Sequence, residues 1–346
     1  MGLGSRRKFC CIGGGTGLFT LLSGLRVHCP SGDVSAVVSM MDSGGSTGRL
    51  RVEHGTLPPG DVRQCLIALS DAPSELLQLM GYRFETGEAL RGHNLGNLVL
   101  TAAKDLAGGE YEAIRFLERI LQVRGHVFPV TLQDCQLVAE LDDGSELVGE
   151  AQIDVRGAGE LVPISRVRLT PPASVFERAA IALLGADYII VGPGDLYTSV
   201  LPNFAVDGLP AAVHAAKHRG ARLIYVVNTM TKRGETDGYS ASRFVEVIEG
   251  VLGSLAIDAV VINTGRVPQH LLENYAVEGA QPVLNDLSDE RRVIVTGDLM
   301  ARQTFARHDS RRLAKAVLAA VEHLPPRPRP GTPPSASRGH DADEGL

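Results

Sequence analysis

The apolar residues of this chain fall into two kinds of segment. Short continuous apolar runs are typical of buried strands, and apolar residues that recur every three or four positions are typical of helices. The predicted strands are Lys8–Ile12, Val34–Met40, Tyr188–Val191, Arg222–Val227, Asp258–Ile262 and Arg292–Val295. The predicted helices are Leu18–Leu25, Asp61–Leu69, Ser74–Met80, Leu95–Leu106, Glu110–Leu121, Val175–Leu184, Val206–His218, Ala241–Leu252, Pro268–Tyr275 and Ser310–His323. Because strands alternate with helices, we predict a Rossmann-like, doubly wound α/β fold with a mainly parallel sheet.

The pattern changes between about residues 127 and 170. Short alternating runs at Gln136–Leu141, Glu146–Gly149 and Arg166–Leu169 surround the turn signal Asp142-Asp143-Gly144. Alternation of this kind predicts antiparallel strands, so we expect a β insertion within a single domain over residues 1–324. Residues 325–346 are rich in Pro, Arg, Ser and Asp, and we expect this tail to be disordered.

Composition narrows the class of protein. Hydrophobic residues make up 44% of the 346 residues and charged residues 21%, as in ordinary globular proteins. The net charge of −6 argues against a protein that binds nucleic acid in bulk. No apolar run reaches the roughly 18 residues of a membrane span, and the N-terminus lacks the apolar region of a signal peptide. Five cysteines without a C-x-x-C pair suit a reducing compartment, so we expect a cytoplasmic protein.

Two glycine clusters each follow a predicted strand. The first is Gly13-Gly14-Gly15-Thr16-Gly17, and the second lies within Asp42-Ser43-Gly44-Gly45-Ser46-Thr47-Gly48-Arg49. Glycine loops at such positions present backbone N–H groups to a phosphate. The first cluster departs from the dinucleotide fingerprint at Leu18, and no lysine follows to make a P-loop, so a tight turn without a ligand stays open. Asp42 could meet a ribose hydroxyl, and Arg49 and Arg51 could neutralise a diphosphate.

Further polar segments follow other predicted strands or open helices. Asp61 opens a helix as either an N-cap or a ligand. His93 could make a polar contact or act as an acid or base, but a satisfied core histidine is the favoured interpretation. Its neighbours Asn94 and Asn97 could hold loops together or face the ligand. In the segments Gly194–Ser199 and Asn228–Thr236, Tyr197 offers a ring for stacking, and Thr198 and Ser199 offer hydroxyls. Because the carboxyl ends of parallel strands meet at one edge of the sheet, we expect these segments to share one site.

The motifs Gly13–Leu18, Asp42–Arg51, Pro59–Leu69, Gly92–Leu98, Gly192–Asn203 and Asn228–Thr236 together resemble the YvcK family. These bacterial cytoplasmic proteins are often called gluconeogenesis factors and are related in fold to the CofD phospholactate transferases. The resemblance covers about residues 8–322. It implies binding of UDP-sugars such as UDP-N-acetylglucosamine, and a role in cell shape and envelope synthesis during gluconeogenic growth. It also implies that Tyr275 and Arg307 belong to the nucleotide-sugar site. From its residue type, we expect Ser310 to be the N-cap of the last helix.

Three positions depart from the family pattern. Ser43 stands where a second aspartate is usual, which puts a metal site of two carboxylates in doubt because a hydroxyl is a weak ligand. Asp195 and Asn94 each stand where a serine is common. The resulting candidate ligand-binding residues are Gly13, Gly14, Gly15, Thr16, Gly17, Asp42, Ser43, Gly44, Gly45, Arg49, Asp61, Asn94, Asn97, Gly194, Tyr197, Thr198, Ser199, Asn228, Thr231, Glu235, Tyr275 and Arg307.

The sequence therefore predicts a UDP-sugar-binding regulator with an unidentified protein partner in envelope synthesis. We assign no catalytic residue, no metal ligand and no required cofactor. The main alternative is a CofD-like transferase that moves a phosphoryl-linked group from a nucleotide diphosphate to an alcohol, with Mg²⁺ as a cofactor that Ser43 disfavours. A second is an enzyme that binds an NAD-like dinucleotide, disfavoured by Leu18 and by the lack of a Tyr-x-x-x-Lys pair. Whether the chain forms a homo-oligomer stays open.

Overall fold

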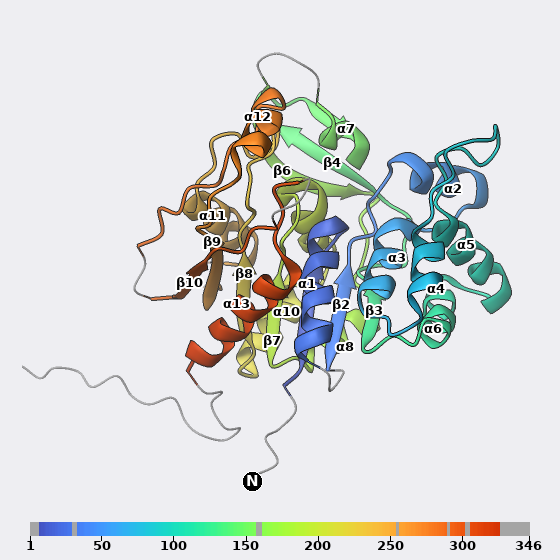
Figure 1. Cartoon of the computed structure of the whole chain (residues 1–346), viewed down its shortest axis with the longest axis horizontal. Helices are drawn as coiled ribbons and strands as arrows, with labels where there is room; N and C mark the ends of the chain where they lie inside the picture. Colours follow the sequence, from blue (N-terminus) through green and yellow to red (C-terminus); the bar gives the residue numbers. More distant parts are fainter. Residues whose placement is uncertain are drawn as a thin grey trace, which may run out of the picture.

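The computed structural model describes residues 7–29, 33–156, 161–253, 256–288, 291–301 and 305–325. Its centre is a parallel sheet of seven strands in the order β10-β9-β8-β7-β1-β2-β3 (Figure 1). The strands are β1 (Phe9–Gly13), β2 (Val34–Val38), β3 (His126–Pro129), β7 (Tyr188–Val191), β8 (Arg222–Val226), β9 (Ala259–Asn263) and β10 (Val293–Gly297). The predicted α/β class and parallel sheet are confirmed.

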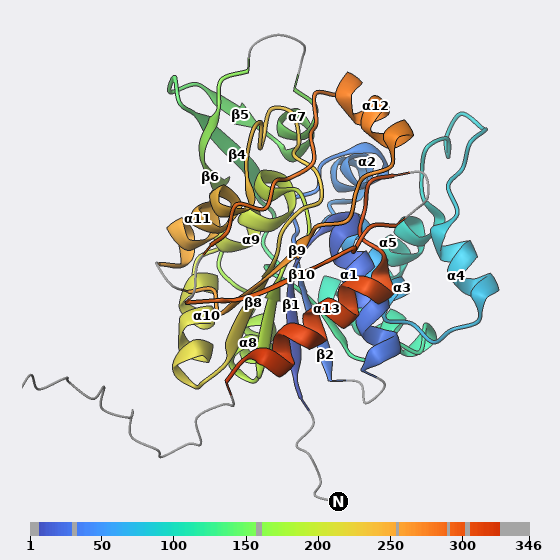
Figure 2. The same cartoon turned by 60° about the vertical axis from the view of Figure 1, so that its left-hand side comes forward.

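Helices cover both faces of this sheet, as Figure 2 shows. One face carries α1 (Gly15–His28), α3 (Pro59–Ala68) and α13 (Ser310–His323), and the other carries α8 (Glu177–Leu184), α10 (Leu209–His218) and α11 (Ala241–Leu252). Beyond β3 lie α2 (Gly45–His54), α4 (Ser74–Gly81), α5 (Leu95–Ala107) and α6 (Glu110–Ile120). With both faces covered, the strands need apolar side chains on each side, which explains their unbroken apolar runs.

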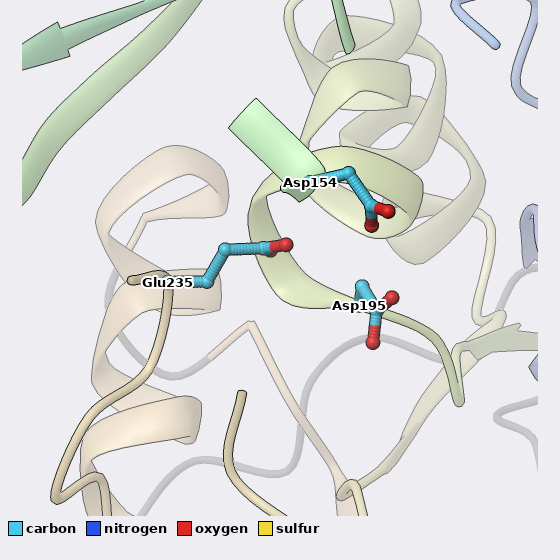
Figure 3. A group of neighbouring side chains, drawn as sticks. All are labelled: Asp154, Asp195 and Glu235. Carbon is cyan, nitrogen blue, oxygen red and sulfur yellow. The ribbon is translucent and has the colours of Figure 1, made fainter. Parts of the chain in front are cut away.

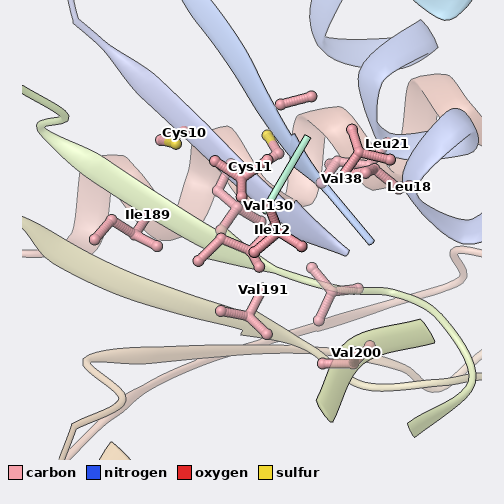
Figure 4. Packing of buried hydrophobic residues seen from close by; sticks show 14 of the residues in the cluster. Cys10, Cys11, Ile12, Leu18, Leu21, Val38, Val130, Ile189, Val191 and Val200 are labelled. Atoms are coloured by element: carbon pink, nitrogen blue, oxygen red, sulfur yellow. The ribbon is translucent and has the colours of Figure 1, made fainter. Parts of the chain in front are cut away.

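The core lies on either side of the central strands. Figure 4 shows Val38 of β2 beside Leu18 and Leu21 of α1, with Ile12 of β1 and Val191 of β7 farther from that helix. All five residues are fully buried.

The cysteines belong to this core. Burial raises the pKa of Cys10 to about 12, so this thiol is neutral and packs as a small apolar side chain. All five cysteines are free, and four of them are buried.

The chain winds in opposite directions on the two sides of β1. From β1 it proceeds through β2 to β3, and after the crossover to β7 it proceeds through β8 and β9 to β10. The strand order therefore reverses between β1 and β7, and the loops that leave the carboxyl ends of these two strands flank a crevice there.

The boundary predicted for the β insertion is wrong at its start. His126–Pro129 is β3, which pairs in parallel with β2 as the edge strand of the main sheet. The antiparallel sheet has the order β5-β4-β6, with β4 (Gln136–Leu141), β5 (Glu146–Val148) and β6 (Ile164–Thr170), and the short helix α7 (Glu150–Asp154) follows β5. The apolar stretch that opens the region belongs to the sheet core because Val127 is fully buried.

Two segments expected to be loops are helical. Gly45–His54 forms α2, and the chain after β7 forms the π-helical turn η1 (Leu196–Val200) and α9 (Leu201–Phe204). Glycine and serine lower helix propensity but do not prevent helix formation where tertiary contacts favour it. Between β9 and β10 the chain forms the helix α12 (Gln269–Val277).

Two expectations concern the ends of the chain and the membrane. The tail predicted to be disordered lies outside the described residues apart from Pro325. Among the residues that the structure describes, no helix combines the length and the apolarity needed to cross a membrane.

Candidate functional site

A cavity of about 880 Å³ lies at the carboxyl edge of the sheet. Loops after β1, β2, β7 and β8 contribute to its wall, together with α7 of the insertion, α12 and the segment before α13 (Figure 1). Its volume lies within the range of roughly 300–1,000 Å³ that small-molecule sites occupy. The position and size identify this cavity as the candidate ligand site.

The loops after β1 and β7 touch each other at the base of the cavity. A Cβ atom on Gly17 would lie 2.2 Å from the carbonyl oxygen of Pro193, so only glycine permits this approach. The Gly194 N–H donates to Asn228 Oδ1 at 3.3 Å, which attaches the loop after β8 to the same point. Gly14–Gly17 begin α1, whose first N–H groups have no partners within the helix.

Segments from the last third of the chain reach the cavity through the loop after β8. Thr229 Oγ1 donates to the Ala306 carbonyl at 2.7 Å. The Thr231 N–H donates to the Gln281 carbonyl, and the Gln281 N–H donates to Thr231 Oγ1. Met230, Leu271, Met300 and Ala306 form a small apolar cluster apart from the main core, with Tyr275 packed against it. These contacts place Tyr275 and Arg307 on the cavity wall.

Arg307 is free to meet a ligand. Its guanidinium lies 4.5 Å from the centroid of the Phe305 ring, and within the described part of the chain it forms no ion pair. Asp309 does not pair with it, because this side chain caps α13 by accepting from the Arg312 N–H. Asp309 is therefore the cap of the last helix, and the expectation that Ser310 is the cap is wrong.

Carboxylates line the part of the cavity near β2. Asp42 comes from the loop after β2, Asp61 from the first turn of α3, and Glu150 is the first residue of α7. Burial and the nearby Asp42 carboxylate raise the pKa of Asp61 to about 7 and that of Glu150 to about 8. Each group also accepts a backbone N–H, Asp61 from Gly15 and Glu150 from Ser43. The site therefore holds carboxyl groups that exchange protons near neutral pH.

Raising the pH from 5 to 8 is expected to lower the melting temperature. An ordinary glutamate ionises near pH ~4.3, whereas Glu150 in the folded protein ionises at about 8. Between these values the folded state keeps a proton that the unfolded state has lost, so higher pH favours unfolding. Glu150→Gln removes this titration and should flatten the dependence, as thermal melts at each pH would show. An unchanged slope in the variant would contradict the assignment. Glu112→Gln, at an exposed position of α6, is the control.

A second acidic group lies beside the first and is paired with a lysine. Figure 3 shows Asp154, Asp195 and Glu235 directed toward one another, and their oxygen atoms lie within 4.8 Å, a spacing that could hold a metal ion. Lys232 Nζ bonds Asp195 at 2.8 Å and Glu235 at 2.9 Å, and also Asp154. Burial disfavours the ammonium, but the carboxylates outweigh it, so the pKa of Lys232 is raised. The lysine thus supplies the positive charge within this group.

Thirteen of the predicted residues line the cavity, drawn from seven separate segments of the chain. They are Gly14, Gly15, Thr16, Gly17, Asp42, Asp61, Gly194, Thr198, Ser199, Asn228, Thr231, Tyr275 and Arg307. The structure therefore brings the loops after four strands to one place, as expected from a parallel sheet. Asp61 does not act as the N-cap of α3, since Pro58 holds that position.

The glycines and arginines of the second cluster do not line the cavity. Gly44 and Gly45 begin α2, and Gly44 N–H donates to Asp42 Oδ1 at 2.9 Å. Because α2 is helical, Arg49 is directed to the Arg91 carbonyl, and Arg51 to Asp134 and the Cys135 carbonyl. The expectation that these arginines face the cavity is therefore wrong.

The other predicted residues outside the wall support it from behind. Gly13 ends β1, Ser43 Oγ accepts the Ala151 N–H at 3.1 Å, and Asn94 caps α5 by accepting from Asn97. Glu235 accepts from the Tyr197 N–H and the Thr198 hydroxyl.

Burial and hydrogen bonds show what three further side chains do. Tyr197 is 3% exposed and its hydroxyl bonds that of Tyr239, so its predicted stacking role is wrong. Asn97 Oδ1 accepts from Arg63 Nε at 2.8 Å, so this side chain joins α5 to α3 and does not hold two loops together. His93 is buried and bonds Ser46 Oγ, so its interpretation as a satisfied core histidine is confirmed.

Several wall residues were not predicted. Glu150, Asp154 and Arg156 come from the insertion, and Lys232, Arg233, Glu278 and His308 from the later segments. Nothing in the local sequence marks the insertion residues, because they reach the cavity only when α7 folds back over it. Lys232 and Arg233 lie inside the polar segment after β8. Their positive charge, close to predicted phosphate-binding loops, was a signal from which they could have been predicted.

The sequence and the fold are similar to those of known proteins. A model of the family described as 2-phospho-L-lactate transferase CofD matches residues 9–300. A protein of Nostoc sp. is 42% identical over 317 residues, covering 90% of this chain and 68% of its own. The gluconeogenesis factor of Bacillus subtilis is 36% identical over 321 residues, covering 91% and 98%. A crystal structure of a UPF0052 family member from Bacillus halodurans has a TM-score of 0.83 and 38% identity, covering 91% of this chain and all of that one.

Proposed function

The chain belongs to the CofD family and to the gluconeogenesis factors within it, and from this premise we propose that its cavity binds a UDP-sugar of the UDP-N-acetylglucosamine type. We further propose that occupancy of the site regulates a partner, linking gluconeogenic carbon metabolism to cell shape and envelope synthesis. The names of the relatives support a role in carbon metabolism. The ligand and the regulatory role are the proposal.

One observation carries the proposal. The loops after β1 and β7 meet at the reversal point of the sheet, with Gly17 against Pro193, and both open on the same cavity. Ligands of open α/β sheets bind in the crevice at this point, and the N-terminus of α1 offers N–H donors to an anion. Thr16, Thr198 and Ser199 add hydroxyl groups beside these donors. A diphosphate is the group that this combination suits.

The charges around the cavity are unevenly placed. Arg156, Lys232, Arg233 and Arg307 follow α7, follow β8 or precede α13, and Asp154, Asp195 and Glu278 line the same side. On the side toward β2 the charged groups are the carboxyls Asp42, Asp61 and Glu150. A diphosphate is stabilised beside the cations. Carboxyl groups accept hydrogen bonds from sugar hydroxyls, and the raised pKa values of Asp61 and Glu150 let them donate as well. This end of the cavity therefore suits a neutral sugar and disfavours an anionic one.

The base is assigned to the opposite side of the cavity. Tyr275 of α12 offers a half-buried ring for stacking, and Arg307 offers planar donors for a carbonyl or phosphate oxygen. Within the described residues, α12 buries only Leu271 and rests on the small satellite cluster. A helix held by so few apolar contacts can change its order when a ligand adds contacts, which gives a partner something to recognise.

The proposal predicts that UDP-N-acetylglucosamine stabilises the protein against heat. At 100 times its dissociation constant a ligand adds about 2.7 kcal/mol. A thermal-shift series should compare this ligand with UDP-glucuronate, GDP and NAD, each with and without Mg²⁺. Arg307→Ala should lose the shift, while Arg311→Ala, an exposed position on α13, should keep it. The proposal fails if no UDP-sugar stabilises the protein, or if Arg307→Ala responds like the parent.

A CofD-like transferase is the second candidate, and the facing Asp42 and Asp61 carboxylates favour it. Carboxylate oxygens are ligands that Mg²⁺ prefers, and such an ion would neutralise charge on a diphosphate during transfer. The serine at position 43 reduces this donor set, because its hydroxyl is already bonded to the Ala151 N–H. Incubation with UDP-N-acetylglucosamine, Mg²⁺ or Mn²⁺ and phospholactate or small alcohols decides the matter. Release of UDP or UMP that vanishes in Asp42→Asn would establish the transferase, and no release supports the regulator.

A further inference from the structure

A second cavity, of about 740 Å³, lies at the opposite edge of the sheet. Its floor is formed where β1, β2 and β3 begin, with Phe9, Ser35 and His126 among its residues. Its sides are α6, through Tyr111 and Arg115, and α8, through Arg178 and Ile181. Parallel sheets are normally covered on both faces. The crevice between these two helices therefore leaves part of the sheet face open to a ligand.

Planar groups line one wall of this second cavity in an unbroken series. Tyr111 and Phe128 are stacked with their centroids 6.2 Å apart and their planes at 21°. The Arg178 guanidinium lies 5.5 Å from the Tyr111 centroid, and His126 lies 5.9 Å from Phe128. Such groups favour a further flat ring in the same series, since offset stacking contributes about 0.5–1.5 kcal/mol per ring pair.

The cations of the second cavity are only partly neutralised. Three cations, Lys8, Arg115 and Arg178, line it against one carboxylate, Asp33, in a protein whose net charge is −6. Arg115 is bonded to the buried Glu118 and lies 3.0 Å from His126 Nδ1. Arg178 has no carboxylate partner within the described part of the chain. Its guanidinium, stacked on Tyr111, keeps donors available beside an aromatic surface.

We propose that this second cavity binds a planar aromatic anion, with its ring against Tyr111 and Phe128 and its anionic group at Arg178 and Lys8. The ligand needs both a flat ring and a negative charge, because the wall of the cavity is aromatic and its available donors are cationic. The site is separate from the nucleotide-sugar cavity, since the two lie at opposite ends of β1 and β2 and share no lining residue. The inference does not depend on the proposed function.

The experiment is calorimetric titration of the whole chain with naphthalene-2-sulfonate. We expect saturable one-site binding, and weaker binding of inorganic phosphate, which lacks the ring, and of 2-naphthalenemethanol, which lacks the charge. Arg178→Ala should weaken binding of the sulfonate about tenfold, as loss of a charged hydrogen bond does. Arg307→Ala in the first cavity and Arg311→Ala on α13 should leave the affinity unchanged.

Three results would overturn this inference. They are the absence of binding, an affinity that Arg178→Ala leaves unchanged, and an equal loss in Arg307→Ala. Should Arg178→Ala fail to fold, Lys8→Ala at an exposed position carries the same test with a smaller expected loss. A parallel titration with UDP-N-acetylglucosamine separates the two sites, because failure of one ligand does not predict failure of the other.

Discussion

Replacement of Gly17 by alanine is expected to abolish binding of the nucleotide sugar and to lower the melting temperature by several degrees. The new Cβ would lie 2.2 Å from the oxygen and 2.6 Å from the carbon of the Pro193 carbonyl. These are backbone atoms, so they cannot rotate away, and the loops after β1 and β7 must separate. Overpacking of this kind costs about 1–3 kcal/mol. Thermal melts and calorimetric titration of the same preparation would measure both effects.

A matched control for this substitution is Gly250→Ala. Gly250 lies within α11, and an added Cβ there would meet no atom within 4 Å. Alanine in a helix interior is favoured over glycine by about 1 kcal/mol, so this variant should be slightly more stable and should bind normally. If Gly17→Ala binds and melts like the parent, the close contact between the two loops is not what shapes the cavity.

Replacement of Lys232 by methionine is expected to destabilise the protein by about 3 kcal/mol at pH 8. The change leaves the fully buried Glu235 carboxylate beside Asp154 and Asp195 without its cation, and removal of one partner from a buried ion pair is costly. Asp154 lies in the insertion, Asp195 follows β7 and Lys232 follows β8. The insertion should therefore also lose part of its attachment to the sheet. Denaturant unfolding across pH would measure the loss.

The loss in Lys232→Met should shrink as the pH falls. Burial raises the pKa of Glu235 to about 7, so acid protonates this carboxyl and removes repulsion that the lysine normally offsets. Lys232→Met combined with Glu235→Gln should recover part of the stability, giving a coupling energy between the two sites in a double-mutant cycle. Two results would contradict this role of Lys232. One is a Lys232→Met variant as stable as the parent at pH 8, and the other is additive effects of Lys232→Met and Glu235→Gln.

The sheet was predictable because its signal is local. Each central strand is a continuous apolar run buried on both faces, and the bounds of β4, β7, α11 and α13 agree with or nearly match the predicted ranges. The loops at the strand ends were predictable for the same reason, since parallel strands bring their carboxyl ends together. The pairing of β3 with β2 was not predictable, because a short apolar run does not say which sheet it joins.

The candidate site was harder to predict where its residues depend on tertiary contacts. Arg49 was expected to face the phosphate because the segment looked like a loop, but the chain is already helical from Gly45. Two hydrogen bonds to Ser43 hold Glu150 at the cavity. The Ser43 N–H donates to the Glu150 carboxylate, and the Ala151 N–H, next to Glu150, donates to Ser43 Oγ. The Ser43 side chain, which departs from the family pattern, thus anchors α7. A contact between residues over a hundred positions apart leaves no pattern in one sequence.

The most direct test of the central claim is a crystal structure of the protein grown with UDP-N-acetylglucosamine. We expect the diphosphate over Gly14–Gly17 and Gly194, the uracil against Tyr275, and the sugar toward Asp42, Asp61 and Glu150. Bound ligand at any other surface would contradict the account. An empty first cavity at a ligand concentration that saturates the thermal shift would contradict it equally.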